Sequence, residues 1–431
     1  MNVPNPPSRE AAPVVAIESL GAQGDGIAQH EGCAIFVPFT LPGDRVRLRL
    51  GERRGEGRAA TVLERLGAGE GRIDPACRHF GTCGGCQLQH LEPARYRAWK
   101  SDLLRTALER RGLDPDPVRP LVAIAPGRRR RARLAALRKG GRLRVGFHER
   151  ASHRVLDLAE CPLLTPMLQA ALPAFRAIAD AVLEEGGSAS LEVAETSGGI
   201  DLLIEQRGRP PGASARAAIA GIAGEHRLMR VSWTAPGGGE PEPLLQLGTP
   251  QVAFGGVAVD LPPGAFLQPS REGEAALLAA VEEATEGRKR VADLFAGCGS
   301  FSLPLAKHAS VHAVEGDRAA VAALAAAAKR AGLGQRLTTE RRDLDRSPLQ
   351  PAELARFDAV VFDPPRAGAA AQSRALAASG IARVVALSCN PASFARDARL
   401  LVDGGMTLDW ALPVDQFPWS PHLELAACFS R

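Results

Sequence analysis

The C-terminal third of the chain alternates short apolar runs with alanine-rich segments, and this alternation limits its fold more than any other feature. The apolar runs have the length and composition of buried strands: Val291–Phe295, Val311–Glu315, Ala359–Asp363 and Val384–Cys389. Helix-forming segments such as Ala319–Ala331 separate them. Strands that alternate with helices in this way form a parallel sheet covered on both faces. We therefore predict an α/β, Rossmann-like domain over residues 263–431.

The N-terminal residues 12–66 have a different pattern. Short β-prone runs are separated by glycine-rich turns such as Gly21–Gly26. This pattern predicts a small OB-like β-barrel of five strands, a size common among RNA-binding modules. The pattern alone supports an RNA-binding module and a purely structural one equally.

Residues 67–262 are predicted to form a central α+β domain. Its strand-like runs are short and spread over the segment: Arg142–Phe147, Ser190–Ala194, Asp201–Glu205 and Arg230–Trp233. The segment 92–118 is helical in pattern, with Leu104 and Leu108 four residues apart. Two placements are open for this helical segment, one against its sequence neighbours and one on the catalytic domain.

The composition is that of an ordinary globular protein, with 45% hydrophobic and 23% charged residues in 431. The net charge of +5 is compatible with a polyanionic partner but does not establish one. Met1–Pro13 lacks the apolar centre of a signal peptide, and no apolar stretch reaches the ~20 residues of a membrane span. We expect a cytoplasmic monomer without a membrane partner. The eight cysteines then suggest metal ligands or catalysts in preference to disulfides.

A glycine-rich turn follows the first strand of the α/β domain, at Ala296–Ser300. About twenty residues later the next strand ends at Glu315, where a carboxylate can bind both hydroxyls of a ribose. NAD is the obvious rival ligand, but the turn lacks the third glycine of the dinucleotide fingerprint. A single nucleoside such as the adenosine of S-adenosylmethionine needs only the tight turn and the acid.

Three further loops carry polar residues suited to catalysis, and they contain Asp363, Cys389 and Glu424. A free cysteine is often a small buried hydrophobe. Cys389, however, ends a strand at the sheet edge expected to hold Glu315. A thiolate that adds to carbon 6 of uracil makes carbon 5 nucleophilic toward a methyl donor, and a carboxylate can then remove the carbon-5 proton. Cys389 and Glu424 have these two chemistries.

Together these motifs resemble the RNA uracil-C5 methyltransferase family, most closely its bacterial 23S ribosomal RNA branch. The runs Ser388–Pro391, His422–Glu424 and Asp363–Gly368 match the nucleophile, base and DPPR motifs of the family. The resemblance implies an N-terminal TRAM domain, Cys389 as nucleophile and Glu424 as base. It also implies a pocket for S-adenosylmethionine and a stacking partner, Phe266, for the target base. The pocket residues implied by the resemblance are Gln268, Phe295, Ser300, Glu315, Asp343 and Asp363.

Four cysteines form a candidate metal site: Cys77, Cys83, Cys86 and Cys161. Four thiolates satisfy either tetrahedral zinc or an iron–sulfur cubane, and the spacing does not decide between them. The resemblance favours a 4Fe–4S cluster. We expect its role to be structural, because the uracil chemistry needs no electron.

The strongest basic feature is the run Arg128–Arg133. Arginine suits phosphate through its planar fork, so Arg129, Arg131 and Arg133 are candidate RNA contacts. The competing interpretation is a solvated basic face.

Two rival functions are weighed against uracil-C5 methylation. An exocyclic-nitrogen methyltransferase would use Asp363 without Cys389, and a non-catalytic RNA-binding protein would keep only the fold. The sequence leaves the target uridine open, in ribosomal or transfer RNA, although the 23S ribosomal RNA is favoured.

Overall fold

The computed structural model describes residues 12–431, and these form two compact units. The first unit runs to Trp99 and also holds Trp419–Pro421, and the second holds Lys100–Pro418 and His422–Arg431. Helix α1 (Pro93–Glu109) begins in the first unit and enters the second at Lys100. Residues 1–11, most of the segment in which no signal peptide is expected, lie outside the described residues.

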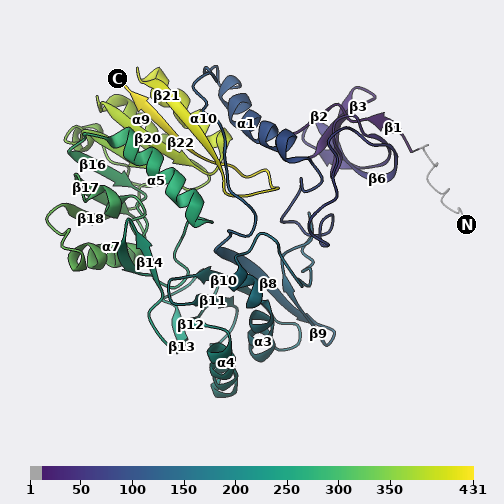
Figure 1. The fold of residues 1–431 in the computed structure, drawn as a ribbon, viewed down its shortest axis with the longest axis horizontal. Helices are drawn as coiled ribbons and strands as arrows, with labels where there is room; N and C mark the ends of the chain where they lie inside the picture. The colour runs from purple at the N-terminus through teal and green to yellow at the C-terminus, as the bar shows by residue number, and fades with distance from the viewer. Residues whose placement is uncertain (1–11) are drawn as a thin grey trace, which may run out of the picture. The chain divides into compact units, whose positions relative to one another are not determined.

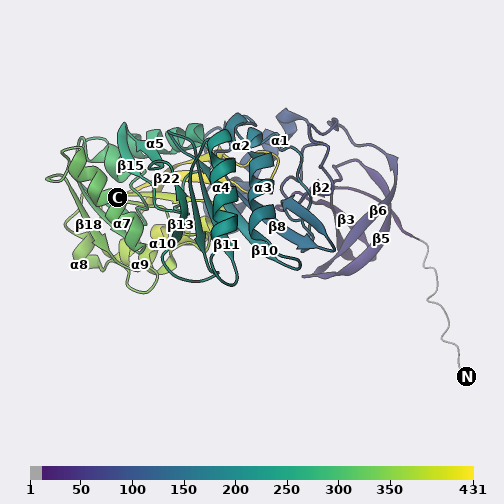
Figure 2. The ribbon, with the colours of Figure 1, turned by 90° about the horizontal axis from the view of Figure 1, so that it is seen from below.

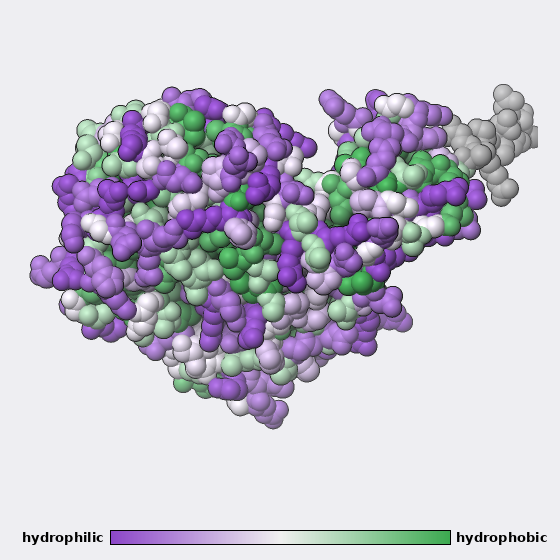
Figure 3. Space-filling view, turned by 45° about the horizontal axis from the view of Figure 1, so that its top comes forward, coloured by the Kyte–Doolittle hydropathy of each residue, from purple (hydrophilic) through white to green (hydrophobic). Residues whose placement is uncertain are grey.

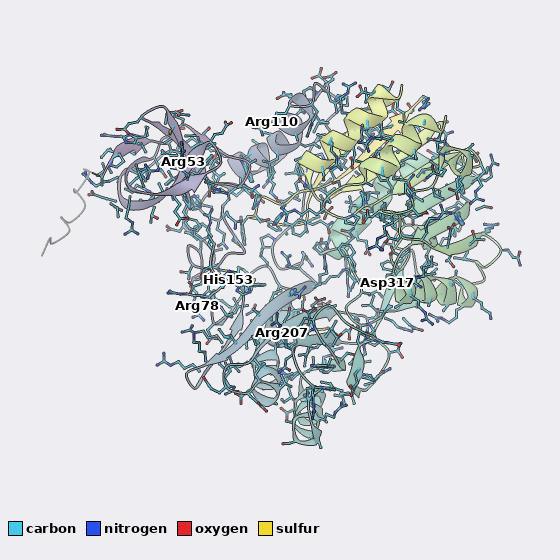
Figure 4. The ribbon with its side chains drawn as sticks, turned by 180° about the vertical axis from the view of Figure 1, so that it is seen from behind. Arg53, Arg78, Arg110, His153, Arg207 and Asp317 are labelled. Carbon is cyan, nitrogen blue, oxygen red and sulfur yellow. The ribbon has the colours of Figure 1, made fainter. Side chains whose placement is uncertain are left out.

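The first unit contains a curled sheet of six strands (Figure 1), one more than the sequence predicts. Its order is β1 (Val14–Ala16), β5 (Arg45–Arg54), β6 (Gly57–Gly67), β4 (Cys33–Val37), β3 (Gly26–His30) and β2 (Ser19–Leu20). The sixth strand, β2, has only two residues, too few to leave a periodic pattern in the sequence. Along β5, Val46 and Leu48 are buried, while the arginines of the strand are exposed, among them Arg53, labelled in Figure 4.

The second unit holds a six-stranded sheet built from the central residues. Its order is β13 (Glu242–Gln246), β12 (Leu228–Thr234), β11 (Ile200–Gln206), β10 (Ser188–Glu195), β8 (Arg131–Lys139) and β9 (Arg142–Gly146). Helices α3 (Leu172–Val182) and α4 (Ala213–Glu225), side by side in Figure 2, pack on one face of this sheet, after the short helix α2 (Pro166–Ala170). Most of the arginine run Arg128–Arg133 lies in or next to β8, a strand that was not predicted because its charged residues interrupt the apolar pattern.

The catalytic sheet of the second unit has eight strands. Its order is β18 (Leu337–Arg341), β17 (Ser310–Glu315), β16 (Arg290–Leu294), β19 (Ala359–Phe362), β20 (Arg383–Ser388), β22 (Glu424–Ser430), β21 (Thr407–Asp415) and β7 (Val122–Ala123). The first five strands are parallel, as predicted, but β22 runs antiparallel to both β20 and β21. The sheet is therefore mixed, because the last two strands follow each other as a hairpin without a crossover helix. A separate hairpin of β14 (Gln251–Phe254) and β15 (Val257–Asp260) precedes it in sequence.

Helices cover both faces of the catalytic sheet (Figure 1), as expected for an α/β domain. One face packs against α5 (Arg271–Thr285), α6 (Ser302–Leu305) and α7 (Arg318–Arg330). The other packs against α8 (Pro351–Leu354), α9 (Ala370–Ala378), α10 (Pro391–Asp403) and the second half of α1. Leu104 and Leu108 of α1 are fully buried in this second layer, so residues 100–109 pack with the catalytic sheet.

Hydrophilic residues cover most of the face of the molecule drawn in Figure 3, with hydrophobic patches between them. Within residues 12–431, the helices are all too short or too polar to cross a bilayer.

Candidate active site at the edge of the mixed sheet

The strand order reverses at β16, which has β17 on one side and β19 on the other. In open α/β sheets such a switch point opens a crevice at the carboxyl ends of the strands, where ligands bind. The loop after β16 carries Phe295 and Ser300, β17 ends at Glu315, and Asp363 follows β19. The structure therefore brings these predicted residues to one edge of one sheet.

The turn after β16 is shaped by left-handed backbone. Phe295 has φ 62°, Gly297 φ 55° and Gly299 φ 97°. A side chain at Gly299 would also lie 2.4 Å from Leu324, so glycine is required there for both reasons. The Glu315 carboxylate accepts hydrogen bonds from the Gly297 amide at 2.9 Å and the Asp317 amide at 2.8 Å. These backbone donors fix a carboxylate beside the turn.

Two further acids line this edge. Asp293, in the middle of β16, is fully buried and accepts a hydrogen bond from the Ser302 hydroxyl. Among the described residues its second oxygen, Oδ1, has no hydrogen-bond partner. Burial raises the pKa of Asp293 to about 7, and the neighbouring Asp363 and Glu315 act in the same direction. A group of acids of this kind suits a cationic ligand such as a sulfonium.

Gln268 is held at the same edge by side chains from two other loops. Its amide nitrogen donates to Asp363 Oδ2 at 3.3 Å, and its oxygen accepts from Gln416 Nε2 at 2.9 Å. Gln416 also accepts from the Ser270 backbone amide and hydroxyl, at 3.3 and 3.1 Å. Gln268 is therefore fixed in orientation, with its amide group directed at Asp363.

The remaining two predicted cofactor residues lie in separate loops. Ser300 is partly buried in the turn before α6. Asp343 is exposed after β18, and its carboxylate accepts hydrogen bonds from the amides of Asp345 and Arg346 at 3.1 and 3.2 Å. Asp343 thus caps its own turn.

Cys389 and Glu424 become neighbours through the antiparallel pairing of β20 with β22. Ser388 pairs with Leu425, so the next residues along the two strands are Cys389 and Glu424. Asn390 follows as the N-cap of α10, accepting from the Ala392 amide at 3.1 Å. Cys389 therefore sits at the strand-to-helix turn, beside a carboxylate that is 4% exposed.

The charges around this pair oppose ionisation of both groups. Burial and the carboxylates of Glu424 and Asp363 raise the pKa of Cys389 to about 11, while Arg366 lowers it. Burial and Asp363 raise the pKa of Glu424, and Arg131 lowers it. Burial also raises the pKa of Asp363. In the free protein the thiol is therefore protonated at neutral pH, and the two acids titrate above the usual carboxylate range.

The predicted RNA contacts are not equivalent. The guanidinium of Arg131 lies 4.3 Å from the centre of the Phe266 ring, and Phe266 is 56% exposed. Burial lowers the pKa of Arg131 to about 10, and Glu424 raises it. Arg129 lies over Phe417 at 5.4 Å, whereas Arg133 contacts only residues of the central sheet. Arg131 is the one of the three that links the basic run to Glu424.

The candidate metal ligands are divided between the units. Cys77, Cys83 and Cys86 belong to the first unit and Cys161 to the second, and all four are free of disulfides. Over the described part of the chain, no three or more histidine, cysteine, aspartate or glutamate side chains are arranged as a metal-binding group.

Sequence reasoning missed three residues of the site. Asp293 could have been found as a lone acid inside an otherwise apolar strand, a pattern that burial makes costly without a function. Arg366 belongs to a motif that was recognised, but its effect on Cys389 was not expected. Gln416 carries no local signal, because its role depends on contact with Gln268, 148 residues away.

Two family models match the chain. The model described as tRNA (Uracil-5-)-methyltransferase matches residues 257–431, and the TRAM domain model matches residues 14–53. An uncharacterized RNA methyltransferase of Mesorhizobium japonicum is 44% identical, over 96% of this chain and 97% of the relative. The 23S rRNA (uracil(1939)-C(5))-methyltransferase of Chromohalobacter salexigens is 36% identical, over 97% of this chain and 89% of its own.

One solved structure agrees over nearly the whole length. It is the tRNA (uracil-54, C5)-methyltransferase of Pyrococcus abyssi in complex with S-adenosyl-L-homocysteine, with a TM-score of 0.74. It covers 96% of this chain and 99% of the other, at 22% sequence identity. This likeness establishes the fold.

Proposed function

The chain belongs to the family of RNA (uracil-C5) methyltransferases, and on that premise we propose that it methylates carbon 5 of one uridine in 23S ribosomal RNA through Cys389 and Glu424. The observation that carries the mechanism is the pairing of β20 with β22, which sets these two residues side by side. Neither rival function needs a thiol and a carboxylate together.

The choice of ribosomal RNA rests on the relative of known substrate. That enzyme, named for uracil 1939 of 23S rRNA, aligns over 97% of this chain at 36% identity. The transfer RNA enzyme of similar fold is only 22% identical, and an identity this low does not indicate the substrate. An RNA substrate also supports the expected cytoplasmic location. We propose that the protein acts as a monomer.

Cys389 begins the reaction in this proposal. Its proton leaves to solvent, and the thiolate attacks carbon 6 of uracil, forming a carbon–sulfur bond while the electron pair of the double bond moves toward carbon 5. Arg366 favours the thiolate, because a nearby positive charge lowers the pKa of a thiol. In the free protein the raised pKa of Cys389 keeps most of the thiol protonated at neutral pH.

Glu424 completes the reaction. Its carboxylate takes the proton from carbon 5, the electron pair of that bond restores the carbon 5–carbon 6 double bond, and the carbon–sulfur bond breaks to return the thiolate. A base with a raised pKa suits this step, since proton transfer is most efficient when the pKa of the base lies near the working pH.

Residues at the other half of the sheet edge would hold S-adenosylmethionine, which supplies the electrophilic methyl group for carbon 5 when it is bound. The glycine turn and Glu315 fit a nucleoside, and the buried acids Asp293 and Asp363 fit a positive sulfonium. Gln268, Phe295, Ser300 and Asp343 are the further pocket residues that we propose.

RNA recognition would combine stacking with phosphate contacts. Phe266 is exposed and beside Arg131, which suits a ring that receives a base extruded from its stack. Arg129 and Arg133 lie on the same basic run and would contact phosphates.

We also propose that Cys77, Cys83, Cys86 and Cys161 bind a 4Fe–4S cluster with a structural role. The support is chemical: four thiols outside disulfides form a donor set that a cubane cluster accepts. Protein purified without oxygen should be brown and should contain four iron atoms per chain, whereas a colourless protein loaded with zinc would contradict the cluster.

The decisive test of the mechanism uses transcribed 23S ribosomal RNA and transfer RNA in which 5-fluorouridine replaces uridine. Fluorine cannot be removed as a proton, so an adduct through Cys389 should survive on a denaturing gel. Cys428→Ala is the matched control, because burial also raises the pKa of that thiol to about 11. The adduct should form with ribosomal RNA, persist in Cys428→Ala and vanish in Cys389→Ala. Methylation of ordinary RNA by Cys389→Ala would instead favour transfer to an exocyclic nitrogen.

A further inference from the structure

Lys100 of α1 is a fully buried ammonium group within the second unit. Its side chain is 0% exposed, and its Nζ donates to Asp415 Oδ1 at 2.8 Å, to the Phe417 carbonyl at 3.4 Å and to the His422 carbonyl. Removing an ammonium from water costs several kcal/mol unless its donors are all satisfied. These acceptors provide partners for the N–H donors of the ammonium group.

The three acceptors belong to one stretch of chain, which leads directly to the proposed base. Asp415 is the last residue of β21, and Glu424 is the first residue of β22. Asp415 Oδ1 also accepts a hydrogen bond from the Phe417 amide at 3.1 Å. Lys100 thus links the two ends of the segment that connects β21 to β22: it binds Asp415 at one end and His422, two residues before Glu424, at the other.

We propose that Lys100 is a positioning residue for Glu424, an inference that rests on the proposed function. Lys100 contacts the chain that leads to Glu424 and acts through the backbone that carries the carboxylate. Without this tie, Cys389 still adds to carbon 6 and carbon 5 is still methylated. The carbon-5 proton is then removed slowly, so the carbon–sulfur bond persists and the enzyme stays attached to its RNA.

The chemistry of the buried pair supports a role in geometry. Replacing a buried ion pair with apolar residues of similar size is often neutral or stabilising, so such a pair is weak support for a purely stabilising role. Phe417 and His422 further pack edge to face, with ring centres 5.7 Å apart, so the same connection is fixed at a second point. Contacts near both of its ends therefore hold the connection between β21 and β22 in place.

The test follows the covalent adduct on ordinary, unfluorinated RNA in four variants of the full-length protein. Lys100→Met and Asp415→Asn each remove one partner of the pair. Glu424→Gln removes the base itself and sets the upper limit for adduct accumulation. Arg105→Met is the matched control, because Arg105 also lies on α1 and donates to two backbone carbonyls, of Pro115 and Val118, both at 3.1 Å.

We expect Lys100→Met to lower kcat by about 10- to 100-fold, the usual effect of a catalytic group displaced by about 1 Å, with KM for RNA little changed. A denaturant-stable, methylated adduct should accumulate in Lys100→Met and Asp415→Asn, as in Glu424→Gln, and should stay at the wild-type level in Arg105→Met. If Lys100→Met does not fold, the adduct level in Asp415→Asn tests the positioning role of Lys100.

The outcomes separate the two proposals. Adduct in Glu424→Gln but none above wild type in the folded Lys100 and Asp415 variants would overturn the role of Lys100 and leave the proposed function intact. No adduct in Glu424→Gln would overturn Glu424 as the base, and the positioning role would fail with it.

Discussion

The carboxyl edge of the catalytic sheet has two halves, and they treat their carboxylates in opposite ways. In the cofactor half, formed by the ends of β16 and β17, two backbone amides hold Glu315 at 2.9 and 2.8 Å. In the reaction half, formed by the end of β20 and the start of β22, Glu424 is 4% exposed and its pKa is raised. Fixed backbone donors hold the first carboxylate in place, whereas burial pushes the second toward its neutral form.

The difference corresponds to what each half would do. A group that only binds works best as a fixed charge, whereas a group that must take up and release a proton needs a pKa near the working pH. Cys389 is also held in its neutral form, because burial raises its pKa to about 11. The comparison predicts that changes in the two halves alter different measurable steps.

The largest effect is expected from Cys389→Ser. Loss of a covalent nucleophile should lower turnover by on the order of 10⁴-fold or more, because serine is not ionised in this site. Binding of S-adenosylhomocysteine, measured by calorimetry, should be unchanged, because that ligand belongs to the cofactor half. A parallel loss of ligand binding would show that the two halves are not separable.

The next effect concerns pH. With the pKa of Cys389 at about 11, the thiolate fraction at pH 6 to 8 is small and rises about tenfold for each pH unit. The rate of adduct formation with 5-fluorouridine RNA should rise accordingly over that range. In Glu424→Gln the neighbouring side chain can no longer ionise. At pH values where the wild-type Glu424 is charged, the pKa of Cys389 is therefore lower in the variant, and the profile shifts to lower pH.

Glu283→Gln is the control for this shift, since Glu283 is an exposed carboxylate paired with Arg119. Its profile should match the wild type. A Glu424→Gln profile that stays in place, or moves to higher pH, would show that the Glu424 charge does not act on Cys389.

The two halves also differ in how far the sequence predicts them. Glu315 and Gly297 each follow a clear strand, so both were found from local patterns. Cys389 and Glu424 were identified from motifs, but their contact depends on β22 being antiparallel, which a pattern of alternating strands and helices does not predict. Their pairing joins segments 35 residues apart in the numbering, through the pairing of Ser388 with Leu425.

Other parts of the site could not be predicted from the sequence, for physical reasons. Strand β8 was not predicted because its outward face carries arginines, while its inward residues, Leu134 and Ala136, form only a short apolar pattern. Lys100 resembles any other lysine of an amphipathic helix until its acceptors, more than 300 positions away, are known. Burial of charge is a tertiary property, and no local pattern encodes it.

A smaller effect than those of the reaction half is expected from Glu315→Gln in the cofactor half. A hydrogen bond to a charged group contributes about 1.5–3 kcal/mol, so the dissociation constant for S-adenosylhomocysteine should rise about 10- to 100-fold. Asp358→Asn is the control, because Asp358 also accepts two backbone amides, of Lys289 and Arg290, at the opposite end of the sheet. Equal weakening in both variants would mean that Glu315 acts through general stability.

The smallest effect is expected from Arg133→Ala, which lies outside both halves. Arg133 is exposed on β8 and already contacts Glu192 at 3.1 Å and Glu205 at 3.3 Å, so only part of its charge is available to a phosphate. RNA affinity should fall a few-fold, and the slope of log affinity against log salt should decrease by about 1.

Arg138→Ala is the control, because Arg138 lies on the same strand but donates to the Leu183 carbonyl on the helix-covered face. Both variants should leave the adduct with 5-fluorouridine RNA at the wild-type level once RNA is saturating. An adduct reduced at saturation in Arg133→Ala would place this arginine in the reaction half and not in RNA binding.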